Sequence, residues 1–366
     1  MATPTEADRI MPLDATRDEI DGTPAAMSRA LEALAPSVRD LATALALRRI
    51  ARVAIIGSGD SLAVGMMAAG AFAQFARRQL DAVQAYEFAT YGYPDFGGDR
   101  AAILISSSGR PSPVRDALTR ALTGDAFVIG VSDRAGRDNP FLSRPAFSLC
   151  PGAAKRGMPT QSTSVTLALL LRLSIEWGQI LGHVIDGTAL EELLIVPKRL
   201  AFIAQAQGKA ASAIGVALGD WRRIHIVGAG PNVGTAEAAA LLFAAGPGLA
   251  AVAHSVEEIH HALKLATLGN GDLVLVLAPR EARAERLLAE TVGAAGKRGA
   301  HVIVLGTSGL GGAAEIPLPR TLEALSPLLM LPVLQRMALS AALSVADNAT
   351  LSFRTRPFAS SYRAEW

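Results

Sequence analysis

The sequence predicts an α/β protein with two tandem doubly wound, flavodoxin-like domains, each holding a parallel sheet flanked by helices. Short runs rich in β-branched residues end in glycine or serine, and helix-length segments follow them. Three such runs recur in the same order 171 to 174 residues later. Hydrophobic residues make up 50% of the 366, which is enough for two cores. Strands that alternate with helices form parallel sheets covered on both faces.

The predicted strands come in three pairs. The first is residues 52–56 and 224–227, the second 102–106 and 273–278, and the third 127–131 and 302–305. Each run is almost continuously apolar, which is typical of strands buried on both faces. Right-handed crossovers would place the carboxyl ends of these strands at one edge of each sheet, where ligands usually bind.

Helices are predicted at residues 113–122, 163–181 and 281–297. The segment 185–199 contains acidic residues and Pro197, and we expect it to be a connector. The sequence therefore divides near residue 190, giving an N-terminal domain of residues 1–190 and a C-terminal domain of residues 191–366.

Composition excludes several classes of function. The net charge of +2 offers no excess of positive charge for a nucleic-acid backbone, so no nucleic-acid partner is expected. Cys150 is the single cysteine, which excludes an intramolecular disulfide and suits a reducing compartment. The N-terminus carries early acidic residues and lacks the apolar run of a secretory signal. We expect a cytoplasmic protein.

No membrane span is predicted. The longest uncharged apolar stretch, residues 238–253, is shorter than the ~20 residues that cross a bilayer, and Gly246, Pro247 and Gly248 interrupt it. We expect it to form a buried helix and a turn. The apolar segment 324–334 is shorter still.

Two loops have the composition of anion-binding turns. After the first strand comes Gly57-Ser58-Gly59-Asp60-Ser61, where glycines admit a ligand to the backbone and a helix start offers unpaired N–H groups. The dinucleotide pattern G-x-G-x-x-G fails here at Leu62, and no cofactor is expected. After the second strand comes Ser106-Ser107-Ser108-Gly109, whose hydroxyls can either bind a phosphate or cap the next helix.

Five motifs in order resemble the tandem sugar isomerase (SIS) domain family, which includes phosphosugar isomerases, deaminases and deglycases. Glu19-Ile20 with Pro24 resembles its E-I-x-x-x-P leader, and Gly59-Asp60-Ser61 with Gly65 its G-T-S-x-x-x-G loop. Glu87-Phe88 resembles the E-F pair that follows the family's next helix, and Ser106 to Gly109 resemble the S-Q-S-G phosphate loop. Residues 157–162, Gly-Met-Pro-Thr-Gln-Ser, resemble the G-V-A-S-T-K segment before a long helix.

The resemblance implies a partner, a phosphorylated sugar or amino sugar, bound in the first domain. The residues it places at the phosphate or sugar are Gly59, Ser61, Ser106, Ser107, Ser108, Gly109, Thr160, Gln161 and Ser162. A family threonine corresponds to Pro111, and Ser112 is its expected substitute. Arg110 and Lys155 replace family carboxylates and would suit a substrate with a second anionic group.

Catalysis in such an isomerase needs an acid/base to open the ring and a carboxylate near C1 and C2. The segment Glu258-Ile259-His260-His261 resembles the family's E-[LF]-[KR]-H, which makes His261 the counterpart of its histidine and His260 the alternative. In the family this histidine reaches a neighbouring subunit's site, so the resemblance implies a homodimer.

The expected catalytic base is missing. The family's synthase branch has E-G-A-L-K-L-K-E after the second glycine loop, whereas this chain keeps only Glu237 and has Leu241 or Leu242 and Ala244 or Ala245 at the lysine and base positions. The tail, residues 356–362, also lacks the catalytic lysine. Replacement candidates are two pairs at helical i,i+4 spacing: His254 with Glu258, and Glu257 with His261. No two of these histidines have H-x-x-x-H spacing, and no metal site is predicted.

Three hypotheses follow. The first is a phosphosugar isomerase, deaminase or deglycase with a non-standard base, acting in carbohydrate metabolism. The second is a protein that binds or senses a sugar phosphate without catalysis, because leucine and alanine occupy the expected catalytic positions. The third is an assembly role without a ligand. Proton exchange at C1 or C2 of a bound sugar distinguishes the first from the second.

Overall fold

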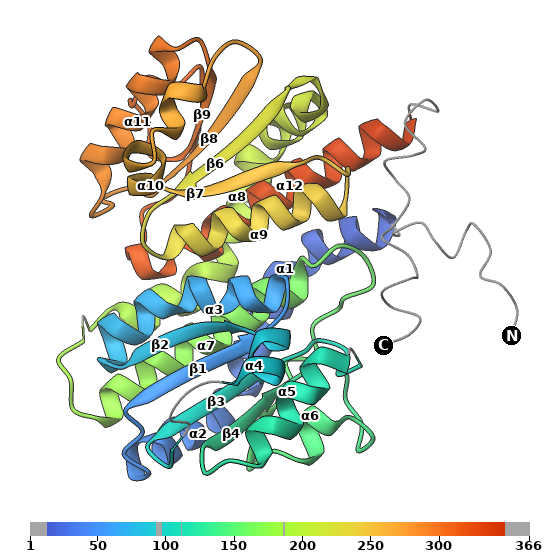
Figure 1. The fold of residues 1–366 in the computed structure, drawn as a ribbon, viewed down its shortest axis with the longest axis vertical. Helices are drawn as coiled ribbons and strands as arrows, with labels where there is room; N and C mark the ends of the chain where they lie inside the picture. The colour runs from blue at the N-terminus through green and yellow to red at the C-terminus, as the bar shows by residue number, and fades with distance from the viewer. Residues whose placement is uncertain (1–12, 93–96, 111, 186, 348–366) are drawn as a thin grey trace, which may run out of the picture. The chain divides into compact units, whose positions relative to one another are not determined.

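A computed structural model of the protein describes residues 13–92, 97–110, 112–185 and 187–347. These residues pack into two compact units. The first-sheet unit comprises residues 22–155 and 161–197, and the second-sheet unit comprises residues 13–21, 156–160 and 198–347. Each unit contains one five-stranded parallel sheet (Figure 1). The division at residue 190 remains our proposal for where one sequence repeat ends and the next begins.

The first-sheet unit has the strand order β2-β1-β3-β4-β5. Its strands are β1 (Arg52–Gly57), β2 (Gln79–Gln84), β3 (Arg100–Ile105), β4 (Phe127–Val131) and β5 (Phe147–Leu149). Because β1 lies inside the sheet, the chain turns one way to β2 and the other way to β3. The carboxyl ends of β1 and β3 therefore form the switch point at which doubly wound sheets bind ligands.

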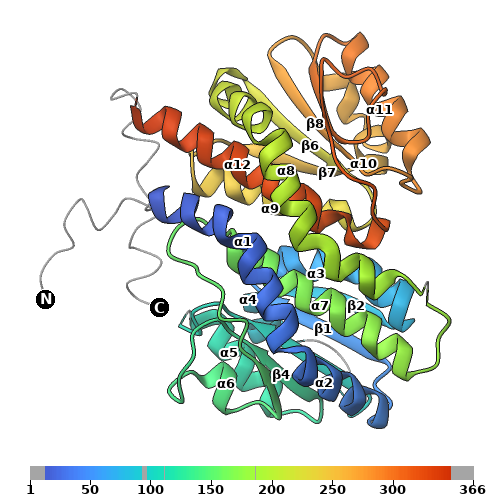
Figure 2. The same ribbon diagram turned by 180° about the vertical axis from the view of Figure 1, so that it is seen from behind.

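Helices cover both faces of this sheet. One face buries Ile56, Leu104 and Val128 against α4 (Ala85–Tyr91), α5 (Ser112–Leu122) and α6 (Pro140–Ser143). The other face packs against α3 (Asp60–Ala71), which continues into a π-helical turn, Phe72–Ala76, and against α2 (Ala35–Leu47) and α7 (Gln161–Ile180) (Figure 2). Gly65 allows α3 to approach Ile55 closely, because a Cβ there would lie 2.9 Å from its Cγ2.

The second-sheet unit repeats this topology. Its strand order, β7-β6-β8-β9-β10, equals that of the first sheet when the strands are counted within the unit. The strands are β6 (Arg223–Gly228), β7 (Ala251–Ser255), β8 (Asp272–Ala278), β9 (His301–Gly306) and β10 (Ala314–Pro317). One face packs against α10 (Val256–His261) and α11 (Glu285–Lys297), and α9 (Pro231–Ala245) and α12 (Ser326–Asp347) lie side by side on the other (Figure 1).

The expected fold class and the three strand pairs are confirmed, and the predicted helices correspond to α5, α7 and α11. The segment 185–199 does join the two units, which meet in sequence between residues 197 and 198. Most of it is helical, however, because α8 (Ala189–Ala217) begins at residue 189 and contains Pro197. Buried Leu193, Val196 and Leu200, spaced three or four apart, favour helix there despite the proline. The stretch 238–253 contains the expected helix and turn, and its last residues, 251–253, begin strand β7, which was not predicted.

One helical segment, Glu323–Val345, is long and apolar enough to cross a membrane by length and composition. Most of its apolar window, 72%, is buried inside the structure, as in the core helix of a soluble protein.

Helix α1 (Leu13–Ala33) supplies a buried carboxylate that orders a loop. This helix is the expected leader, and its Glu19, which is 1% exposed, lies in the second-sheet unit. The Glu19 carboxylate accepts hydrogen bonds from the N–H groups of Arg156 and Gly157 and from the Thr160 hydroxyl. The leader glutamate therefore fixes the segment 156–160, which precedes α7.

Candidate functional site

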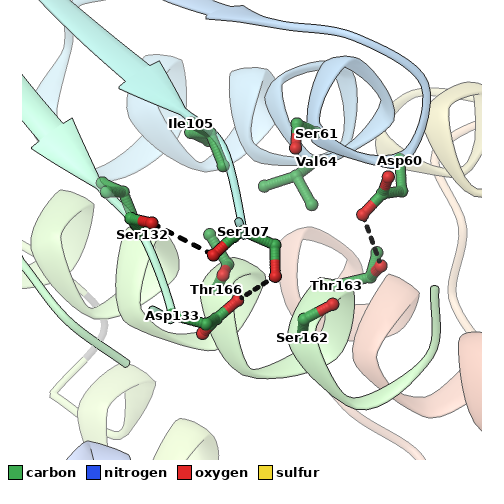
Figure 3. A pocket seen from close by; sticks show the side chains of 11 residues that line it. Asp60, Ser61, Val64, Ile105, Ser107, Ser132, Asp133, Ser162, Thr163 and Thr166 are labelled. Carbon is green, nitrogen blue, oxygen red and sulfur yellow. Dashed lines mark hydrogen bonds between the residues drawn. The ribbon is translucent and has the colours of Figure 1, made fainter. Parts of the chain in front are cut away.

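A polar hollow lies at the carboxyl edge of the first sheet (Figure 3). It is lined by the start of α3, the ends of β3 and β4 with the residues that follow them, and the first turns of α7. The lining residues are Asp60, Ser61, Val64, Ile105, Ser107, Val131, Ser132, Asp133, Ser162, Thr163 and Thr166. The hollow holds about 240 Å³ of empty space, open solvent included.

The turn after β1 brings α3 to the hollow. Gly57 is required there, because a Cβ would lie 2.7 Å from the Cβ of Ser61. Gly59, the residue just before α3, has a φ of 58°, which glycine adopts without strain. These glycines let Ser61 line the hollow at the positive end of a helix.

The loop after β3 presents backbone N–H groups. The Ser106 hydroxyl accepts a hydrogen bond from the Gly109 N–H at 3.2 Å, and Gly109 has a φ of +65°. Within the described part of the chain, the N–H groups of Ser107 and Ser108 donate no hydrogen bond. Successive free N–H groups in such a turn make an anion-binding nest.

Ser162 faces the same hollow from the first turn of α7. Its side chain is 2% exposed, and its hydroxyl oxygen has no hydrogen-bond partner in the structure. Buried polar groups in native proteins are nearly always paired, so an unpaired one that lines a hollow points to a ligand. Thr166 lies one turn further along the same helix face.

Two carboxylates also line the hollow. Asp60 forms an ion pair with Lys155, whose Nζ is 2.9 Å from both carboxylate oxygens, and accepts a hydrogen bond from the Thr163 hydroxyl at 3.3 Å. Asp133 accepts hydrogen bonds from the Ser107 hydroxyl at 2.8 Å and from the Ala153 N–H at 3.1 Å. Burial raises the pKa of Asp133 to about 6, against the opposing effects of these hydrogen bonds and of Lys155.

Among the residues expected at the phosphate, Ser61, Ser107 and Ser162 line the hollow, and Ser106, Ser108, Gly109 and Gly59 form its turns. The other three do not line it. The Ser112 hydroxyl donates to Asp116, the Thr160 hydroxyl donates to Glu19, and Gln161 accepts from the Ala154 N–H. The charge of Lys155 is directed to Asp60, and Arg110 is exposed.

Sequence reasoning missed Asp60, Ser132, Asp133, Thr163 and Thr166 as lining residues. A signal for Asp133 was present. It lies two residues after the third predicted strand, whose carboxyl end must lie at the same edge as the other two.

The expected catalytic residues belong to the second-sheet unit and do not form one cluster. His254 lies in β7, not on the helix, so its expected pairing with Glu258 is wrong; Ser255 caps α10, and its hydroxyl accepts from the Glu258 N–H. His254 instead stacks on His225, with 3.0 Å between its Nε2 and the Nδ1 of His225. Burial lowers the pKa of His254 to about 4.

The remaining residues of this segment lie on α10. His260 Nε2 is 2.8 Å from the Thr291 hydroxyl. His261 Nδ1 lies 3.6 Å from a Glu257 carboxylate oxygen, and the His261 side chain is 78% exposed. Helix α9 carries one acidic residue, Glu237, which is exposed, and has no residue in place of the missing base. In the part of the chain that the structure describes, no three His, Cys, Asp or Glu side chains could together hold a metal ion.

Comparison with solved structures shows the fold. The chain superposes on the C-terminal domain of glucosamine-fructose-6-phosphate aminotransferase from Francisella tularensis with a TM-score of 0.80 and 16% identity, covering 90% of this chain and 96% of that one. It superposes on tagatose-6-phosphate ketose/aldose isomerase from Escherichia coli with a TM-score of 0.76 and 21% identity, covering 95% and 96%. Glucosamine-6-phosphate deaminase from Thermotoga maritima gives a TM-score of 0.68 and 19% identity, covering 90% and 94%.

No protein-family model matches the sequence, and no curated protein matches it closely enough to count as a relative. The fold is therefore the tandem SIS fold that the motifs suggested, shared with proteins of 16 to 21% identity over nearly the whole described chain.

Proposed function

We propose that the protein binds a phosphorylated sugar and that the hollow of the first-sheet unit receives the phosphate group. The observation that carries this proposal is a set of unpaired donors at the hollow and in the loop beside it. The free N–H groups of Ser107 and Ser108 and the unpartnered hydroxyl of Ser162 all belong to the hollow or its loop. N–H nests and helix N-termini bind phosphate without needing a lysine.

Solved structures of similar fold include proteins named for tagatose 6-phosphate and glucosamine 6-phosphate. Both compounds are phosphorylated hexoses, which makes them suitable first ligands to try.

We further propose that the protein is an enzyme acting on such a sugar by isomerisation, deamination or removal of an amine. The acid/base candidates are Glu257, Glu258, His260 and His261 on α10. The exposed His261, held near Glu257, would serve the site of a second copy of the chain, so a homodimer is part of this proposal. We place the protein in the cytoplasm.

A specific observation favours binding without catalysis as a second candidate. Helix α9, which carries the base in the synthase branch, has Leu241, Leu242, Ala244 and Ala245 in the relevant positions, and Glu237 is exposed. Apolar side chains cannot abstract a proton. A sensing protein would keep the hollow and lose these groups.

Titration with glucosamine 6-phosphate and tagatose 6-phosphate, followed by calorimetry, tests the binding. We expect both to bind, and Ser162→Asp to abolish binding by placing a third carboxylate in the hollow. Thr43→Asp, which adds the same charge at an exposed site of the same unit, should bind as wild type does. Failure of both sugar phosphates to bind the wild-type protein would refute the proposal.

Proton exchange separates the two candidates. The bound sugar is incubated in deuterium oxide, and deuterium at C1 and C2 is measured by NMR. Incorporation that disappears in His261→Ala supports an enzyme that uses α10. Tight binding with no incorporation assigns a binding or sensing role.

A further inference from the structure

The hollow has an unusual charge balance for an anion site. It contains two carboxylates, Asp60 and Asp133, and the nearby cation, Lys155, is held by Asp60 at 2.9 Å from both oxygens. Among the described residues, Asp133 has no ion-pair partner. A phosphate group entering beside an ionised Asp133 would meet like charge in a buried space, where electrostatic repulsion is strong.

The hydrogen bonds around Asp133 add to this conflict. Its Oδ2 accepts the proton of the Ser107 hydroxyl at 2.8 Å, and its Oδ1 accepts the Ala153 N–H at 3.1 Å. A serine hydroxyl has one proton to donate. While Asp133 is ionised, Ser107 therefore points its proton at Asp133 and turns only lone pairs toward the hollow (Figure 3).

A proton on Asp133 would reverse this arrangement. The protonated carboxyl would donate from Oδ2 to the Ser107 oxygen, and the Ser107 proton would be free to point at an anion. The N–H groups of Ser107 and Ser108 and the Ser162 hydroxyl would then act beside it. One proton removes the repulsion and supplies a donor.

The surroundings of Asp133 bring its pKa to about 6, which is closer to neutral pH than the ordinary value of 3.8. Burial raises the pKa most and the charge of Asp60 on α3 adds to the rise, while the hydrogen bonds of Ser107 and Ala153 and the charge of Lys155 oppose it. The thiol of Cys150, which follows β5, contacts the Asp133 carbonyl. Arg134 is directed away, to the Ser108 carbonyl and to Asp138. Helix α7 contributes the hydroxyls of Ser162, Thr163 and Thr166.

We propose that Asp133 couples binding of the phosphate group to the uptake of one proton. The hollow then holds the anion while Asp133 is neutral, and it releases the anion and the proton together. This inference rests on the proposed function, because it takes the hollow as the phosphate site. The proton comes from solvent to Asp133 Oδ2 and returns to solvent when the ligand leaves. No covalent bond is made or broken.

Isothermal calorimetry on the full chain tests the coupling directly. Glucosamine 6-phosphate is titrated at pH 8 in two buffers that differ in ionisation enthalpy, and the difference in measured heat gives the protons taken up. We expect one proton for each ligand bound. Above pH 7, where Asp133 and a phosphate monoester with a second pKa near 6 are both ionised, affinity should fall about tenfold for each pH unit. Inorganic sulfate, which cannot hold the proton itself, should show the same uptake and thereby place the proton on the protein.

Asp133→Asn sharpens the test. The amide mimics the neutral carboxyl, because Nδ2 can donate to Ser107 and Oδ1 can still accept from Ala153. We expect no proton uptake, affinity for sulfate independent of pH, and about 100-fold tighter sulfate binding than wild type at pH 8, two units above the wild-type pKa. Asp125→Asn removes an exposed carboxylate from the same unit and should keep the wild-type slope.

The outcomes separate the two proposals. Binding of glucosamine 6-phosphate or sulfate to wild type without proton uptake overturns the coupling and leaves the phosphate site intact. Proton uptake that persists unchanged in Asp133→Asn also overturns it. Absence of binding to both proteins from pH 5.5 to pH 9 overturns the proposed function itself. The wild-type measurement decides the question even if the variant does not fold.

Discussion

The carboxyl edges of the two sheets show how one fold can either keep or close an anion site. The two sheets have the same strand order, and the glycines just before the equivalent helices α3 and α9 share a conformation, with φ and ψ of 58° and −122° at Gly59 and of 53° and −126° at Gly230. The backbone that could cradle an anion is therefore present twice. The side chains around it differ.

In the second-sheet unit, neighbouring side chains form hydrogen bonds with the polar groups at that edge. Asn232, in the first turn of α9, donates to the Ser326 hydroxyl at 2.8 Å and accepts from Thr235 at 3.0 Å. The Glu323 carboxylate accepts the Arg283 N–H at 3.2 Å. In the first-sheet unit, the Ser107 and Ser108 N–H groups and the Ser162 hydroxyl stay unpaired. Duplication of the fold preserves the framework, and the pairing of a few polar groups decides which copy can bind a ligand.

Disturbing the serine loop should have the largest effect. Gly109→Ala forces a side chain into a φ of +65° and places its Cβ 2.3 Å from the Asn139 Oδ1. We expect it to lower the free energy of unfolding by about 3 kcal/mol and to abolish sugar-phosphate binding. Urea unfolding followed by circular dichroism measures the first effect, and calorimetry the second.

Gly182→Ala is the matched control, because it has a φ of +72° and a Cβ there would have no neighbour within 4 Å. It should cost about 1 kcal/mol from backbone strain alone. Equal losses in the two variants would show that Asn139 does not fix the loop.

The two units should respond to pH in opposite directions. Burial holds the pKa of His254 at about 4, below its unfolded value of 6.5, so the folded second-sheet unit binds fewer protons than the unfolded chain. The contribution of His254 to the free energy of unfolding is present above pH 6.5 and is lost as the pH falls toward 4. Urea unfolding at pH 7.5 and pH 4.5 should show a loss of about 2 kcal/mol that disappears in the double variant His225→Phe, His254→Phe, which keeps a stacked pair without titration.

The pH dependence that Asp133 gives to the free energy of unfolding has the opposite sign. The folded pKa of Asp133, about 6, exceeds the unfolded value of 3.8, so its contribution is present below pH 3.8 and is lost as the pH rises through 6. Asp133→Asn should therefore raise the free energy of unfolding at pH 7.5 by about 1 kcal/mol or more and leave it nearly unchanged at pH 3.5. The same urea titrations measure this, with Asp125→Asn as the exposed control. A loss of stability in Asp133→Asn at pH 7.5 would contradict the raised pKa.

The side chains that pair polar groups at the carboxyl edge of the second sheet should matter for stability and not for ligand binding. Asn232→Ala removes two buried hydrogen bonds, so that the Thr235 hydroxyl loses its acceptor and the Ser326 hydroxyl keeps only its bond to the Glu323 carbonyl. We expect the free energy of unfolding to fall by about 1 to 2 kcal/mol, with affinity for glucosamine 6-phosphate unchanged. Weaker binding in this variant would mean that the second edge takes part in ligand binding.

The sequence predicts the fully buried strands well and the edge strands poorly. The six predicted runs are almost continuously apolar because helices cover both faces of the inner strands. Edge strand β2 reads Gln-Leu-Asp-Ala-Val-Gln and is only half-buried, so it has no comparable pattern. Edge strand β7 is short and leads straight into α10, which is why the i,i+4 spacing of His254 and Glu258 suggested a single helix.

The candidate site is predictable to a similar extent. Ser61, Ser107 and Ser162 stand out because hydroxyls at strand ends and helix starts suit an anion. Ser112 has the same signal and fails, because its hydroxyl is taken by Asp116 within its own helix. The raised pKa of Asp133 was not predictable from local sequence. Burial raises it, and the groups that limit the rise, Ser107, Ala153 and Lys155, come from separate parts of the chain.

Removing the unpaired hydroxyl in the first-sheet unit should have the smallest effect on stability and the most selective effect on binding. Ser162→Ala deletes a buried oxygen that has no partner, so the free energy of unfolding should stay the same or rise by about 0.5 kcal/mol. Affinity for a sugar phosphate should fall about five- to tenfold through loss of one hydrogen bond. Thermal melts with and without glucosamine 6-phosphate measure both quantities. The comparison with Asn232→Ala is informative, because a polar group that stays unpaired at a cost to stability is explained by a ligand. If Ser162→Ala destabilised the protein without changing its affinity for the sugar phosphate, Ser162 would be a structural residue like Asn232.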